Sequence, residues 1–203
     1  MDGSIVVSRP QGAHELVLLF HGVGSSAANL VPFAQRIARH RPQAMVVSVD
    51  AAHPSTLGSG REWFSVAAVT ETNRPARIAQ ALPQFESAVR KWQAEAGPTP
   101  AGTTLVGFSQ GAIMSLESTQ EADLAHRVVS IAGRFAQPPR RAPADVAFRF
   151  VHGENDPVIE ARFSVEAVQT LRSLGGDASA HFVPRLGHGI DERAAQLALE
   201  SLG

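Results

Sequence analysis

Short apolar runs alternate with longer amphipathic stretches along this chain. Seven runs are predicted to be β-strands, at residues 5–8, 15–21, 44–50, 103–108, 127–133, 146–153 and 179–184. Several of them are apolar throughout instead of alternating, which is typical of parallel strands that helices cover on both faces. Run 5–8 is expected to be a preceding edge strand and run 179–184 the last strand.

Four stretches between these runs carry apolar residues at helical spacing. They span residues 30–38, 78–92, 163–174 and 191–202, and a further helix is expected to follow residue 109. Pro75 suits a first helical turn, whereas Pro83 falls inside the second stretch and predicts a kink or a break there. Gly175 and Gly176 favour a helix end after the third stretch.

The alternation of strands and helices predicts an α/β fold with a mostly parallel central sheet, flanked by helices on both faces and joined by right-handed crossovers. The 203 residues fit one domain, and no repeat, low-complexity tract or linker divides them. We therefore expect a single domain over residues 1–203. A chain of this length buries about 70% of its unfolded surface without disulfides or metals.

Composition narrows the class of protein. Lys and Arg number 18 against 19 Asp and Glu, for a net charge of −1, so no electrostatic feature indicates a nucleic acid or an anionic membrane as partner. The absence of cysteine excludes disulfides, thiolate metal sites and a cysteine nucleophile, and fits a reducing cytoplasm. The first twelve residues lack signal-peptide character, and no apolar stretch approaches the roughly 20 residues of a membrane span. We expect a soluble cytoplasmic protein.

The segment "GFSQG", residues 107–111, matches the G-x-S-x-G pattern and lies between a predicted strand and a predicted helix. A serine on such a sharp turn adopts a strained backbone, so its neighbours must be small. The helix that follows directs its N–H groups to the place where negative charge develops. This context favours Ser109 as a nucleophile, although a plain tight turn is the alternative.

A serine hydroxyl needs a base to remove its proton, and the base needs an orienting carboxylate. On this architecture both should follow the serine in chain order, each just beyond a strand. Asp156 in "HGENDPV" and His188 in "RLGHGI" satisfy this order. Carboxyl ends of parallel strands gather at one edge of the sheet, so the three side chains are predicted to meet there.

Other interpretations of these residues are available. Asp156 could merely cap a helix, and Glu154 and Asp191 are further candidate acids, although Asp191 is predicted to lie within the last helix. His21 and His152 each precede a glycine at a strand end and are interpreted as hydrogen-bonding supports for loops.

The loop "FHGVGSS", residues 20–26, precedes the first long helix and can supply an oxyanion hole together with the residue after the nucleophile. The predicted donors are the backbone N–H groups of Val23 and Gln110. A phosphate-binding loop is the alternative, but the segment lacks the G-K-[ST] ending and does not complete G-x-G-x-x-G.

With these motifs, the chain resembles the α/β-hydrolase superfamily and, within it, the phospholipase/carboxylesterase family that includes acyl-protein thioesterases. The segments that carry the resemblance are residues 18–24, 60–66, 107–118, 152–159 and 186–191. The resemblance implies Ser109 as nucleophile, Asp156 as orienting acid and His188 as base. It also places Trp63 and Phe64 in the segment that lines the substrate groove of relatives, with core packing as the alternative for both.

What the resemblance implies for the substrate is a small-molecule ester or thioester, with no metal and no cofactor. Residues 50–60 lack the longer proline-rich pattern of eukaryotic thioesterases, so ester hydrolysis is implied more directly than protein deacylation. Residues 134–145 are too few for a helical lid, which predicts an open site for short- to medium-chain esters. The alternative functions are acyl-protein thioesterase or lysophospholipase activity and a non-catalytic binding protein on the same scaffold. The sequence leaves the oligomeric state open between a monomer and a homodimer.

Overall fold

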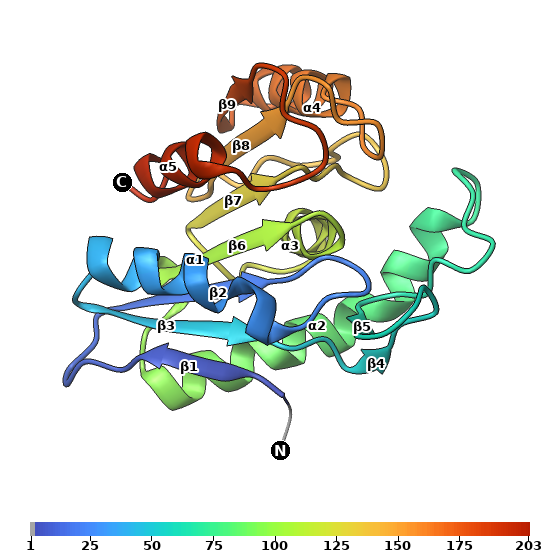
Figure 1. The fold of residues 1–203 in the computed structure, drawn as a ribbon. Coiled ribbons are helices and arrows are strands. Elements are labelled where there is room, and N and C mark those ends of the chain that lie inside the picture. The colour runs from blue at the N-terminus through green and yellow to red at the C-terminus, as the bar shows by residue number, and fades with distance from the viewer. Residues whose placement is uncertain (1–2) are drawn as a thin grey trace.

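A computed structural model describes residues 3–203 and contains a seven-stranded sheet with helices on both faces (Figure 1). The strands of this sheet are β1 (Ile5–Ser8), β2 (Glu15–Phe20), β3 (Ala44–Val49), β6 (Thr103–Phe108), β7 (Arg127–Ile131), β8 (Ala147–Gly153) and β9 (Asp177–Val183). Their spatial order is β1-β3-β2-β6-β7-β8-β9. All neighbouring pairs are parallel except β1 and β3, which are antiparallel. The predicted fold class, with its mostly parallel sheet, is therefore confirmed.

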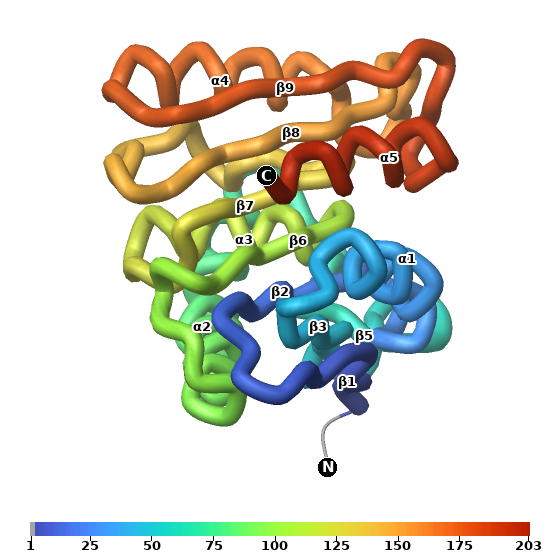
Figure 2. The backbone as a smooth tube through the Cα atoms, turned by 90° about the vertical axis from the view of Figure 1, so that its left-hand side faces the viewer, coloured from blue at the N-terminus to red at the C-terminus, as the bar shows by residue number. Residues whose placement is uncertain are grey.

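The described residues also form five α-helices and one short 3₁₀-helix. They are α1 (Ala27–His40), α2 (Arg74–Ala96), η1 (Pro100–Gly102), α3 (Gln110–Glu121), α4 (Arg162–Ser173) and α5 (Glu192–Glu200). Figure 2 shows α1 and α5 on one side of the sheet and α2, α3 and α4 on the other. Among residues 3–203, none of the helices combines the length and apolar character that a bilayer crossing requires.

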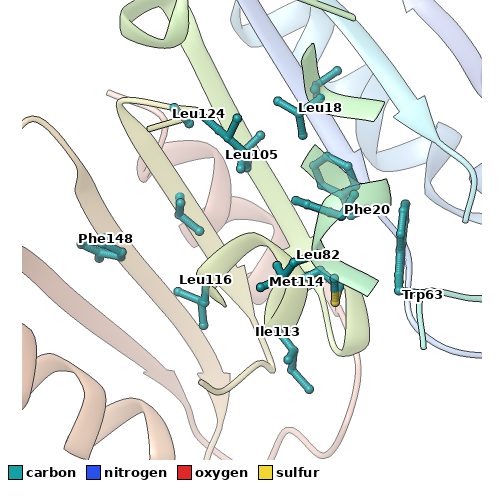
Figure 3. Packing of buried hydrophobic residues seen from close by; sticks show 14 of the residues in the cluster. Leu18, Phe20, Trp63, Leu82, Leu105, Ile113, Met114, Leu116, Leu124 and Phe148 are labelled. Carbon is teal, nitrogen blue, oxygen red and sulfur yellow. The ribbon is translucent and has the colours of Figure 1, made fainter. Parts of the chain in front are cut away.

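Each face of the sheet has its own apolar core because side chains alternate between faces along a strand. Leu16, Leu18 and Phe20 of β2 point to the face of α2 and α3, where Figure 3 shows part of the packing. Val17 and Leu19 point to the opposite face and pack with α1 and α5 residues. The sheet is thus buried on both faces, which explains why its strands read as continuous apolar runs.

Two local features differ from expectation. Of the kink or break expected at Pro83, the break does not occur, because α2 runs from Arg74 to Ala96 through the proline; Ile78, Leu82 and Phe85 are buried on both sides of it and hold the helix against the core. Asp191 lies outside α5 as its N-cap, where its side chain accepts a 2.7 Å hydrogen bond from the Ala194 N–H.

A small hairpin that sequence reasoning missed lies at the carboxyl edge of the sheet (Figure 1). It pairs β4 (His53–Pro54) with β5 (Arg61–Glu62). Two-residue strands are too short to show a hydrophobic period, so no pattern in the sequence could reveal them. Farther along the chain, residues 132–146 connect β7 directly to β8 without a helix, so this connection forms no helical lid.

Candidate active site

Ser109 occupies the turn between the end of β6 and the first residue of α3. Its backbone has φ 52° and ψ −116°, a conformation that costs a non-glycine residue about 1–3 kcal/mol. The Ser109 N–H donates a 2.9 Å hydrogen bond to the Ile131 carbonyl at the end of β7, which holds the strained turn against the sheet. The hydroxyl is thereby presented at the carboxyl edge of the parallel strands.

The two glycines of the motif allow α3 to approach the sheet closely. A Cβ atom at Gly107 would lie 2.4 Å from the Ala112 backbone, and one at Gly111 would lie 2.2 Å from the Phe20 carbonyl oxygen. Neither separation is tolerable, so any side chain at these positions would push the helix away. Glycine at 107 and 111 therefore follows from helix–sheet packing.

The structure brings together the three side chains that were predicted to meet. His188 Nε2 lies 2.8 Å from the Ser109 hydroxyl oxygen, and His188 Nδ1 lies 2.7 Å from Asp156 Oδ2. The Asp156 side chain is fully buried, whereas that of His188 is 17% exposed. An imidazole in this position can accept the serine proton through Nε2 while its Nδ1–H is held by the carboxylate.

Backbone hydrogen bonds hold the Asp156 carboxylate in place. Its Oδ1 accepts from the Val158 N–H at 2.8 Å and from the Ile159 N–H at 2.9 Å. Burial raises the pKa of Asp156, but the hydrogen bonds from His188, Ile159 and Val158 outweigh this, and the net pKa lies below its usual range. The carboxylate is therefore charged at neutral pH and can orient the imidazole.

The loops after β8 and β9 are joined to each other, which explains how Asp156 meets a histidine 32 positions away. The Glu154 N–H donates to the Val183 carbonyl at 3.0 Å, and the Asn155 N–H donates to the Leu186 carbonyl at 2.9 Å. The alternative acid Glu154 has an exposed side chain, and Asp191 caps α5. Of the three acids considered, Asp156 is the one in contact with His188.

His152 supports the loop that carries Asp156 through hydrogen bonds. Its Nε2 lies 2.7 Å from the Ile159 carbonyl, so this nitrogen carries the hydrogen, and its Nδ1 accepts from the Ser164 hydroxyl at 2.7 Å. Burial lowers the pKa of His152 below the ordinary value of 6.5, which keeps the ring neutral. The 3.3 Å separation from Asp156 is therefore a contact of a neutral ring with a carboxylate, and no ion pair is formed.

We expect the buried His152 to make the fold labile in mild acid. Its pKa is lowered in the folded state, so below about pH 6.5 the unfolded chain binds more protons, and the free energy of unfolding falls as pH falls. The loss approaches about 1.4 kcal/mol per pH unit within the window between the two pKa values. Urea unfolding at pH 7.5 and pH 5.5 measures it.

The matched variant for this prediction is His152→Gln, which removes the titrating ring. The buried Glu117, whose pKa is raised by burial above its ordinary value of 4.5, acts in the opposite direction, and His21 acts in the same direction as His152. The difference in pH slope between the wild type and the variant therefore isolates His152. Equal slopes in the two proteins would contradict the prediction.

A pocket of about 500 Å³ opens beside Ser109. Val23 and Gln110, the predicted oxyanion donors, line it together with the serine, and so do apolar side chains such as Val66 and Ile113. Because Gln110 is the first residue of α3, the positive end of the helix dipole lies at the same place. The arrangement can stabilise an anion that forms next to the Ser109 hydroxyl.

The Gln110 side chain has a structural role that sequence reasoning missed. Its Oε1 accepts from the Trp63 N–H at 2.7 Å, and its Nε2 donates to the Phe64 carbonyl at 2.6 Å. These two bonds connect the start of α3 to a segment 47 positions earlier in the chain. One side chain thus holds the wall of the pocket against the turn that carries Ser109.

The loop that carries Val23 is held by the short β5 strand. The Gly24 N–H donates to the Arg61 carbonyl at 2.9 Å, and Arg61 Nε donates to Asp50 Oδ2 at 2.8 Å. His21 is fully buried, and its Nε2 accepts from the Ala51 N–H at 3.1 Å. The expectation that His21 and His152 hydrogen-bond to loops agrees with these contacts.

The two aromatic residues of the expected substrate segment point to different places. Phe64 lines the pocket that contains Ser109. Trp63 is not among the residues that line it. Its ring packs against Phe20 (Figure 3) and against Phe85, with centroids 5.4 Å away in each case, and its Nε1–H donates to the His21 carbonyl at 2.8 Å. For Trp63 the structure therefore corresponds to the alternative of core packing, because the indole finds both apolar neighbours and an acceptor there.

Three charged residues in the lining of the pocket were not anticipated. Glu71, Arg74 and Arg134 line it, and both arginines pair with the single carboxylate of Glu71. Glu71 and Arg74 lie three positions apart, whereas Arg134 lies 63 positions after Glu71 in the connection that follows β7, and none of them belongs to a recognisable motif. Within residues 3–203, no group of three or more His, Asp or Glu side chains is arranged to hold a metal ion.

Comparison with known proteins supplies the family. The sequence model of the Phospholipase/Carboxylesterase family matches residues 1–203. Esterase YpfH of Escherichia coli is 44% identical over 202 residues, which cover 99% of this chain and 87% of YpfH. The crystal structure of esterase PE8 has a TM-score of 0.89 and 28% identity, covering 99% of this chain and 96% of its own.

A carboxylesterase from Mesorhizobium loti shares the fold with a TM-score of 0.78 at 22% identity, over 93% of this chain and 88% of its own. The family match spans the segments that position Ser109, Asp156 and His188. The chain belongs to the phospholipase/carboxylesterase family, whose members are hydrolases with the α/β-hydrolase fold.

Proposed function

We propose that this protein is a serine carboxylesterase that hydrolyses short- to medium-chain carboxylic esters and thioesters through an acyl-enzyme intermediate, with residues 1–203 acting as one lid-free domain. The observation that carries the proposal is the continuous hydrogen-bonded chain from Ser109 through His188 to Asp156, at the edge of a pocket. The names of its relatives, esterase YpfH and esterase PE8, support the same class of reaction.

In the acylation step, His188 Nε2 takes the proton of the Ser109 hydroxyl as its oxygen attacks the carbonyl carbon of the ester. The new C–O bond turns the carbonyl oxygen into an oxyanion. When the tetrahedral intermediate collapses, the bond to the alcohol or thiol breaks, and the leaving group departs with the proton from His188. Asp156 keeps the imidazolium oriented throughout, because its charge is maintained at neutral pH.

The oxyanion is proposed to accept hydrogen bonds from the backbone N–H groups of Val23 and Gln110. Each such donor is worth about 3–4 kcal/mol of barrier in comparable enzymes. In deacylation a water molecule gives its proton to His188, and its oxygen attacks the acyl carbon. The bond to Ser109 then breaks, the serine recovers the proton from His188, and the carboxylic acid is released.

We expect the purified protein to hydrolyse p-nitrophenyl butyrate at neutral pH without added metal or cofactor. A fluorophosphonate probe should block this activity and label one residue, Ser109, which mass spectrometry of the labelled peptide identifies. Because residues 132–146 form no lid, the rate should rise smoothly with ester concentration and show no jump when the ester forms micelles.

Several outcomes would contradict the proposal. A protein inert to every activated ester and unlabelled by the probe would leave a binding protein on a hydrolase scaffold as the remaining interpretation. A marked jump in rate at the micelle transition would contradict the open, lid-free site. Turnover of an S-acylated peptide far above that of the small esters would favour an acyl-protein thioesterase.

A further inference from the structure

A second hollow lies directly beyond the pocket that contains Ser109. Its volume is about 360 Å³, and apolar side chains that include Phe135, Pro138 and Ala167 line it. Two residues, Arg134 and Phe163, line both the hollow and the pocket. The two spaces therefore lie on opposite sides of one partition that consists of these two side chains.

Arg134 is held firmly within this partition. Its guanidinium lies 3.7 Å from the centroid of the Phe163 ring, and its Nη2 and Nη1 donate to the Glu71 carboxylate at 3.0 and 3.3 Å. Its Nε donates to the Phe135 carbonyl at 3.1 Å. The side chain is only 11% exposed, so four contacts and burial fix a residue that is normally long and mobile.

The wall of the second hollow is anchored independently of Arg134. Buried Glu117 of α3 accepts a 2.6 Å hydrogen bond from the Ala136 N–H, and Gln120 accepts from the Arg140 and Arg141 N–H groups at 2.8 and 3.0 Å. The backbone that surrounds the hollow is thus attached to a core helix. The removable part of the partition is the Arg134 side chain, and the hollow should persist without it.

We propose that Arg134, clamped by Glu71 and Phe163, is a specificity-determining residue that ends the acyl groove and so limits the length of the ester chain. The inference rests on the proposed esterase function. The pocket beside Ser109 is lined by the apolar residues Val66 and Ile113 and also by Arg134, whose side chain separates an ester chain in this pocket from the apolar lining of the second hollow. Extending the chain past a charged, paired arginine would require breaking its ion pair, so longer esters gain nothing from their added methylenes.

The test compares wild type and Arg134→Ala over p-nitrophenyl esters from acetate to decanoate, at concentrations below micelle formation. We expect kcat/KM for acetate and butyrate to change less than about threefold. For longer esters it should rise by up to about fourfold for each added methylene that reaches the second hollow, mainly through KM. The optimum chain length should shift upward accordingly.

Arg74→Ala is the matched control. Arg74 also lines the first pocket and pairs with Glu71, but it does not line the second hollow. The Arg74→Ala substitution also removes one positive charge from the pocket but leaves Arg134 in place, so the chain-length optimum should not change. If Arg134→Ala does not fold, Glu71→Gln answers the same question, because loosening the clamp should raise long-chain turnover in part.

The proposal is overturned if Arg134→Ala hydrolyses short esters normally with an unchanged chain-length profile, or if Arg74→Ala shifts the profile equally. Either result leaves the esterase function intact. Failure of the wild type to hydrolyse any ester or to react with a fluorophosphonate would instead refute the proposed function itself.

Discussion

Ser109→Ala is expected to reduce turnover of p-nitrophenyl butyrate by about six orders of magnitude, to a rate near the detection limit. In the proposed mechanism the Ser109 hydroxyl oxygen forms the acyl bond, and no other hydroxyl lies within hydrogen-bonding distance of His188 among the described residues. Loss of the serine removes the covalent route entirely, whereas loss of one oxyanion donor would cost only about 10²–10³. Steady-state kinetics and fluorophosphonate labelling measure the effect.

Ser115→Ala provides the control for a serine on the same helix. Its buried hydroxyl donates to the Gly111 carbonyl at 2.8 Å and does not contact His188. Activity of this variant should stay within a few-fold of wild type, and both variants should give the circular dichroism spectrum of the folded protein. Residual activity of Ser109→Ala above about one thousandth of wild type would exclude Ser109 as the nucleophile.

The second large effect is expected for Asp156→Asn, which should lower kcat by about 10⁴. Two backbone N–H groups point at Oδ1, so an asparagine must place its carbonyl oxygen there and its NH₂ toward His188. The imidazole then has to accept at Nδ1, which leaves the hydrogen on Nε2, facing Ser109. In this tautomer His188 cannot take the serine proton, although the geometry is almost unchanged.

Glu154→Gln is the matched control, since Glu154 is an acid two positions away with an exposed side chain. It should retain wild-type kcat and KM. The pH dependence of kcat adds a second readout. In Asp156→Asn, kcat should rise with pH in the alkaline range, where hydroxide can take the proton that His188 no longer accepts. A loss of tenfold or less in Asp156→Asn, or a comparable loss in Glu154→Gln, would contradict the assigned role of Asp156.

Much of the sheet was predictable because its signals are local. Strand β6 was predicted with its observed bounds, Thr103–Phe108, since six mostly apolar residues precede a glycine-flanked serine. The meeting of Ser109, Asp156 and His188 could be predicted as well, because parallel strands place their carboxyl ends at one edge. The 2.7 and 2.8 Å separations needed the structure, because they depend on loop-to-loop hydrogen bonds.

Other features have no local signal. Pro83 argues against a helix in isolation, yet burial of the flanking side chains keeps α2 continuous. The sequence around Trp63 is compatible both with an indole that faces a substrate and with one that faces the core. The ring lies in the core because it packs against Phe20 and Phe85, which are distant in sequence.

By itself the sequence determined the α/β architecture, the strained serine turn and the chain order of the three polar residues, since hydrophobic period and glycine sterics act over a few neighbouring positions. Only the tertiary structure decided how the pocket is bounded. The pairing of Arg134 with Glu71 joins residues 63 positions apart, and Gln110 reaches Trp63 across 47. Such contacts depend on how elements that are distant in sequence pack together, so no local sequence pattern predicts them.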